Sequence, residues 1–98
     1  MSDIQRATNP LARKDLKDIW RYTHSKWGKP QADLYLRRIN DAISTLCAYP
    51  ELGTAIDEVR SGYRKFDVGS HMVIYRFDDT TVHVTRVLHQ AMDLDRHI

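Results

Sequence analysis

The chain has 98 residues and a mass of 11.5 kDa, which fits one domain over residues 1–98. Its 15 lysines and arginines against 13 acidic residues give a net charge of only +2. That balance argues against binding driven mainly by nucleic-acid phosphates. We also expect no sequence-specific DNA binding by this chain alone. The 42% hydrophobic and 29% charged residues are typical of soluble globular domains.

Cysteine content and short apolar runs exclude several further classes. Cys47 is the single cysteine, which rules out an internal disulfide and a multi-cysteine zinc site. We expect it to fill a small buried space. No apolar run is long enough for a membrane span, and the N-terminus lacks the apolar core of a signal peptide. The sequence therefore predicts a cytoplasmic domain without a cofactor or metal.

The first half of the chain predicts a short strand and two helices. Residues 4–8 are weakly strand-like, and Asn9-Pro10 then suits an N-cap followed by a first helical position. Apolar residues recur at helical spacing as far as Trp27, and Gly28 ends the helix. Core packing is expected of Trp20 and Trp27 on this stripe, although a tryptophan at the rim would suit a partner.

A second helix begins near Pro30 and is stopped by Pro50. With only Gly28-Lys29 between them, the two helices should form an antiparallel hairpin. Residues 50–53 predict a turn, and residues 54–62 predict a loop.

The second half changes to a period of two. Residues 63–68, 71–77 and 81–88 predict three strands, joined by turns at Gly69-Ser70 and Asp79-Thr80. The tail, residues 91–98, predicts a short helix or a frayed end. The fold class is therefore α+β, with an N-terminal strand, a helix hairpin and a three-strand antiparallel meander.

Two-residue turns fix which side chains share a face of the meander. The face predicted to form the core contains Phe66, Val68, Val73, Tyr75, Phe77, Val82, Val84 and Leu88. Arg64 and Arg86 point to the same face, so each is expected to lie near the rim or to reach an acidic partner. The opposite face collects Lys65, Asp67, Met72, Ile74, Arg76, His83, Thr85, Val87 and His89.

With both helices on the core face, 98 residues leave nothing to cover the other one. Met72, Ile74 and Val87 should then form an exposed apolar patch, which usually indicates binding. An incoming amphipathic helix, or a strand added at a sheet edge, would cover it.

Catalytic patterns are sparse. Arg76, His83 and Lys65 on the open face would suit phosphate binding and proton transfer in metal-free RNA cleavage, or form a solvated surface with Asp67 neutralising Lys65. His83 and His89 lie about 20 Å apart along one strand and cannot share a metal. The glycines lack the spacing of a phosphate-binding loop.

Five short motifs, which follow one another along about residues 4–95, resemble the pattern of a known family. They are Ala12-x-x-Asp15-Leu16-x-x-Ile19-Trp20-x-Tyr22, Leu46-x-x-Tyr49-Pro50-x-Leu52-Gly53, Gly62-Tyr63-Arg64, Val73-Ile74-Tyr75-Arg76 and Arg86-Val87-Leu88-His89. This pattern is similar to the ParE family of toxins, within the ParE/RelE superfamily of bacterial type II toxin–antitoxin systems.

The resemblance implies a two-layer RelE/ParE-like fold and a ParD-like antitoxin whose C-terminal segment folds on binding. It also implies a toxin–antitoxin hetero-oligomer, with a mixed tetramer as the family expectation. The implied target is DNA gyrase, inhibited by binding and not by a reaction.

The sister RelE branch, which cleaves mRNA on the ribosome, is the enzymatic alternative. Its members typically carry an arginine where Met72 stands, and a thioether cannot supply that charge. Under this alternative the candidate catalytic groups are Arg64, Arg76, Arg86 and His89. A third possibility is a non-toxic domain that only pairs with its antitoxin in autoregulation.

The predicted contacts for antitoxin or target fall into two classes. Arg64, Arg76 and Arg86 are the charged contacts, and Trp27, Met72 and Ile74 are the apolar ones.

Overall fold

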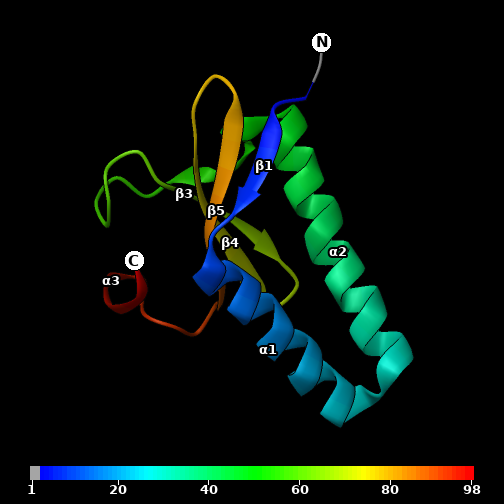
Figure 1. The fold of residues 1–98 in the computed structure, drawn as a ribbon. Coiled ribbons are helices and arrows are strands. Elements are labelled where there is room, and N and C mark those ends of the chain that lie inside the picture. The colour runs from blue at the N-terminus through cyan, green and yellow to red at the C-terminus, as the bar shows by residue number, and fades with distance from the viewer. Residues whose placement is uncertain (1–2) are drawn as a thin grey trace.

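A computed structural model describes residues 3–98 and shows a five-stranded sheet with a helix hairpin against one face (Figure 1). The strands are β1 (Gln5–Thr8), β2 (Thr54–Ala55), β3 (Arg64–Val68), β4 (His71–Phe77) and β5 (Thr81–His89). The helices are α1 (Pro10–Trp27), α2 (Lys29–Ala48) and the one-turn α3 (Leu94–His97), with a 3-10 turn at Pro50–Leu52. The predicted α+β order is confirmed, and β2 is an added strand within the segment predicted as a loop.

The sheet has the order β1-β5-β4-β3-β2. Strand β1 runs parallel to β5, and the other neighbours are antiparallel. The N-terminal strand therefore pairs with the last strand of the chain, and it forms one edge of the sheet.

The helix hairpin follows the local signals in the sequence. Pro10 stands in the first turn of α1. Gly28 adopts a φ of 88° between the helices, a left-handed conformation that glycine accepts without strain. The two apolar stripes pack on the sheet and form a core with Ala12, Ile19, Ile39, Ile43, Leu46, Cys47, Val68, Val73, Tyr75, Val82, Val84 and Val87.

Tyr75 fixes the turn that follows α2. Its side chain is fully buried, and its hydroxyl donates to the Pro50 carbonyl over 2.6 Å while accepting the Gly53 N–H over 2.9 Å. Burial raises the pKa of this phenol, so it stays protonated and keeps its donor.

The predicted register is confirmed between β3 and β4, where Val68 opposes His71 and Phe66 opposes Val73. It is also correct at the start of β5, where Tyr75 opposes Val84. A β-bulge then leaves Thr85 unpaired, so Val73 opposes Val87 and the prediction that it opposes Arg86 is wrong. The bulge moves Val87 into the helix-side core and Leu88 to the opposite face.

The face opposite the helix hairpin is not open, as the sequence had indicated. Met72 is 4% exposed, and Ile74 and Leu88 are 0% and 1% exposed. The segment after β2 and the C-terminal tail cover them, through Ile56, Val59, Tyr63, Leu94 and Ile98. The prediction of an exposed patch at Met72, Ile74 and Val87 is wrong, because these short segments bury Met72 and Ile74 in a second small core and the bulge places Val87 in the helix-side core.

Candidate partner-binding site

The predicted apolar contacts divide sharply in exposure. Trp27 is 71% exposed at the end of α1, so it is a rim tryptophan and not a core residue. Trp20 lies partly buried and donates from its indole N–H to Asp33 over 2.9 Å. Met72 and Ile74 belong to the second core and offer no surface to a partner in this fold.

Two of the predicted charged contacts are used inside the molecule. Arg64 donates to the backbone carbonyls of Gly53 and Glu51 over 2.7 and 3.1 Å. Arg86 makes a two-pronged ion pair with Asp15, the acidic partner that the sequence allowed for it. Only Arg76 remains exposed among the three predicted arginines.

The residues of the catalytic alternative are not brought together. Arg76 lies opposite His83 near one end of β4, whereas His89 lies opposite His71 at the other end. His71 and Arg76 are five positions apart on β4, which corresponds to about 17 Å of strand. With Arg64 and Arg86 already engaged, this set forms no common site.

The cationic cluster predicted around Arg76 is largely neutralised. Lys65 lies 3.3 Å from an oxygen of Asp67, and His83 lies 3.1 Å from an oxygen of Asp78. Across residues 3–98, no three histidine, cysteine or acidic side chains are grouped to hold a metal ion. Cys47 is buried, as expected, and burial raises the pKa of its thiol, which disfavours the reactive thiolate.

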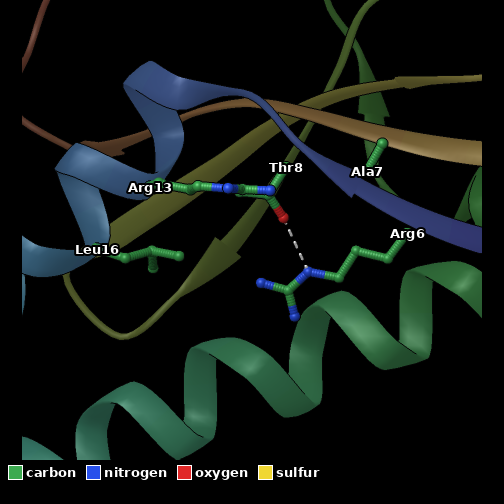
Figure 2. Close-up of a pocket in the computed structure, with 5 residues that line it drawn as sticks. All are labelled: Arg6, Ala7, Thr8, Arg13 and Leu16. Atoms are coloured by element: carbon green, nitrogen blue, oxygen red, sulfur yellow. Dashed lines mark hydrogen bonds between the residues drawn. The ribbon is translucent and has the colours of Figure 1, made fainter.

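A groove of about 630 Å³ lies beside the edge strand β1, between that strand and the start of the helix hairpin. Figure 2 shows Arg6, Thr8, Arg13 and Leu16 converging on it, from β1 and α1. We call this the edge groove. Its walls combine two cations with an apolar leucine side chain.

The backbone of β1 adds hydrogen-bonding groups to the edge groove. Gln5 and Asn9 donate their N–H groups toward β5, to the carbonyls of Thr80 and Val84. Because strand residues alternate, the N–H groups of Arg6 and Thr8 point to the opposite edge. That edge has no neighbouring strand among the residues described, so it can accept one from another chain.

The position and surroundings of the Arg6 guanidinium suit the binding of an anion. Its Nε donates to the Thr8 hydroxyl over 3.1 Å, which fixes the guanidinium over the groove (Figure 2). Although the side chain is exposed overall, partial desolvation by the surrounding protein lowers the pKa of Arg6. A carboxylate placed in the groove would offset that desolvation.

The edge groove was not predicted from the sequence. Arg13 looks like any residue on the wet face of α1, and Arg6 lies in a four-residue strand with little pattern. The informative signal is the position of β1 at the edge of the sheet. That position depends on pairing with β5 across most of the chain, which no local spacing reveals.

Comparison with known proteins places the chain among bacterial toxins. The model of the family described as "ParE toxin of type II toxin-antitoxin system, parDE" matches residues 8–94. Toxin ParE1 of Mycobacterium tuberculosis H37Rv is 46% identical over 91 residues, covering 92% of this chain and 93% of that toxin.

Two solved structures share the fold. The chromosomal ParDE toxin–antitoxin system of P. aeruginosa aligns with a TM-score of 0.75 at 15% identity, over 88% of this chain and 95% of that one. The RelBE2 toxin–antitoxin complex of M. tuberculosis aligns with a TM-score of 0.66 at 23% identity, over 91% of this chain and all of that one.

Proposed function

Because the chain belongs to the ParE toxin family of type II toxin–antitoxin systems, we propose that it inhibits DNA gyrase by binding and that a ParD-like antitoxin neutralises it. The observation that favours binding over catalysis is the separation of the candidate catalytic groups. Arg64 and Arg86 hold the fold together, and Arg76 and His89 lie at opposite ends of their strands.

The edge groove is the proposed antitoxin site. An antitoxin segment that pairs with β1 would extend the sheet by one strand, and its carboxylates would meet Arg6 and Arg13. Leu16 would receive an apolar side chain of the same segment. Main-chain pairing would supply affinity, and the two arginines would select an acidic partner.

A gyrase supercoiling assay with purified toxin tests the target. The proposal expects loss of supercoiling or accumulation of cleaved DNA as toxin is added. If gyrase is unaffected while mRNA is cut on translating ribosomes, the protein is instead a RelE-like endonuclease. If neither reaction responds and cells expressing the toxin grow normally, only the antitoxin-pairing role remains.

Charge reversal tests the antitoxin site. In complexes with the antitoxin encoded beside the toxin gene, the double variant Arg6→Glu/Arg13→Glu should weaken affinity at least tenfold. Arg96→Glu is the matched control, since Arg96 is an exposed arginine on α3 outside the edge groove. Equal affinities of the wild type and the double variant would rule the groove out.

A further inference from the structure

A second hollow lies near the turn of the helix hairpin, against the β3–β4 turn and the end of β5. It has a volume of about 310 Å³, and its aromatic and imidazole lining comes from Tyr22, Trp27, Tyr35, His71 and His89. We call it the aromatic notch. It shares no lining residue with the edge groove.

Two large aromatic side chains of the notch are exposed to solvent. Tyr22 is 62% exposed and Trp27 is 71% exposed. Neither belongs to the two hydrophobic cores, so folding does not explain them. Tryptophan and tyrosine are the residue types that most often dominate binding energy at protein interfaces.

The floor of the notch is rigid. The Tyr35 hydroxyl accepts the Ser70 N–H over 3.0 Å and lies 2.6 Å from Nδ1 of His71. Gly69 makes room for this contact, because a Cβ at position 69 would lie 2.7 Å from the Tyr35 ring. The turn and α2 are therefore fitted to each other before any partner arrives, which lowers the entropic cost of binding.

Two cations lie beside the aromatic rings of the notch, although the Asp15 carboxylate that pairs with Arg86 also acts on His71. The Lys26 ammonium lies 5.6 Å from the centre of the Tyr22 ring, and the Arg38 guanidinium lies 5.8 Å from the centre of the Tyr35 ring. Among the described residues that line the notch, none carries a carboxylate. The complementary occupant is negatively charged and brings an apolar group to the aromatic rings.

We propose that the aromatic notch is the surface through which the toxin binds its protein target, and that it accepts an acidic segment bearing an apolar side chain. This inference rests on the proposed function, since it requires a toxin that acts by binding a protein. Because the notch and the edge groove are separate, toxicity and antitoxin binding can be disrupted independently.

Trp27→Ala tests the proposal, with Tyr49→Ala as the matched control. Tyr49 is 67% exposed and lies just after the far end of α2, about 30 Å of helix from Trp27. Trp27→Ala should raise the toxin concentration for half-inhibition of gyrase at least tenfold and relieve growth arrest on induction. Tyr49→Ala should match the wild type, and both variants should keep their melting temperature and their antitoxin affinity.

The role of positive charge at the notch is tested by comparing Lys26→Glu with the control Lys14→Glu. Both lysines are exposed residues of α1. Only Lys26→Glu should lose toxicity. A Trp27→Ala variant that remains fully toxic overturns the proposal, as does one that loses antitoxin affinity in parallel. A nucleic-acid occupant is tested with a fluorescent single-stranded oligonucleotide and, separately, with gyrase protein free of DNA. If the toxin binds the oligonucleotide only when Trp27 is present and does not bind the gyrase protein, the proposal is overturned in favour of a nucleic-acid occupant.

Measuring growth arrest in cells that express the toxin distinguishes a failure of the notch proposal from a failure of gyrase as the target. If the wild type arrests growth but leaves gyrase unaffected, gyrase is the wrong target, and the Trp27→Ala growth assay still decides the notch. If the wild type neither arrests growth nor inhibits gyrase, both proposals fall.

Discussion

The carboxylate of Asp15 on α1 accepts two hydrogen bonds, of 2.8 and 2.9 Å, from the guanidinium of Arg86 on β5. The same carboxylate accepts the backbone N–H of Val87 over 2.9 Å. Both side chains are mostly buried, at 14% and 20% exposed. The pair ties the first helix to the last strand just beyond the β-bulge, where the strand ladder is interrupted.

Asp15→Ala should therefore destabilise the fold by about 2–4 kcal/mol, since it leaves a mostly buried guanidinium and a backbone N–H without their acceptor. Urea unfolding followed by circular dichroism measures the change. Asp18→Ala is the control, because Asp18 is 52% exposed and its pair with Lys14 is long at 3.4 Å. That variant should lose less than about 1 kcal/mol. Equal losses in the two variants would show that the Asp15–Arg86 pair adds no stability.

Ile74→Ala tests the second core directly. The side chain is fully buried beneath the segment after β2 and the C-terminal tail, so truncation should cost about 2–4 kcal/mol through lost burial and a residual cavity. Leu34→Ala, on the 49% exposed Leu34 of α2, should change stability by about 0.5 kcal/mol or less. A neutral Ile74→Ala would mean that this face of the sheet is open in solution.

His71 should make the fold sensitive to mild acid. Burial, and then the neighbouring His89, lower the pKa of His71 in the folded state below its ordinary value near 6.5. The unfolded chain therefore binds more protons as the pH falls through this range, and stability that is present at neutral pH is lost below about pH 6.5. Comparing urea midpoints at pH 7.5 and pH 5.0, His71→Gln should show a smaller fall than the wild type.

Ser70→Ala, in the same turn, keeps the His71 imidazole and should retain the fall seen in the wild type. A His71→Gln variant with an unchanged pH response would assign the acid sensitivity to other groups.

Asp78 should govern the response to strong acid. Its carboxylate accepts the N–H groups of Thr80 and Thr81 and contacts His83, with the Thr80 backbone bond as the largest cause of a pKa of about 2. The folded-state pKa lies below the unfolded value of 3.8, so the stabilisation is present above about pH 4 and is lost as the pH falls toward 2. Thermal melts of Asp78→Asn should show a weaker dependence on pH between 4 and 2 than those of the wild type.

Asp79→Asn removes a carboxylate from the same turn but leaves the Asp78 bonds in place, so its melts should keep the steep dependence. A steep dependence retained in Asp78→Asn would contradict this role for the turn.

Local signals predicted most of the secondary structure. Pro10, Gly28 and Pro50 mark the helix ends, and the Gly69-Ser70 turn sets the register of β3 and β4 correctly. The bulge at Thr85 was not predicted, although the alternation of Val82 and Val84 breaks there and leaves Arg86 in the core-face phase. It reverses every side chain beyond it, which explains the misplaced Val87 and Leu88.

Long-range packing explains the remaining errors. Ile56, Leu94 and Ile98 are isolated apolar residues in polar segments, and only the folded chain brings them onto one face of the sheet. The expected exposure of Met72 and Ile74 was wrong for that reason. Trp27 is exposed because the helix turn projects it beyond the core, an outcome that periodicity alone cannot distinguish from burial.

The parallel pairing of β1 with β5 has a consequence for synthesis of the toxin. β1 ends at residue 8, and the strand that holds it begins at residue 81. A ribosome that adds about 5–20 residues per second therefore needs about 4–15 s to supply the partner of β1. During that interval the edge groove has an incomplete wall, so a nascent or truncated chain lacks the finished surface that an antitoxin would recognise. Antitoxin recognition through this groove would thus require a chain that extends at least through residue 84, the last partner of β1.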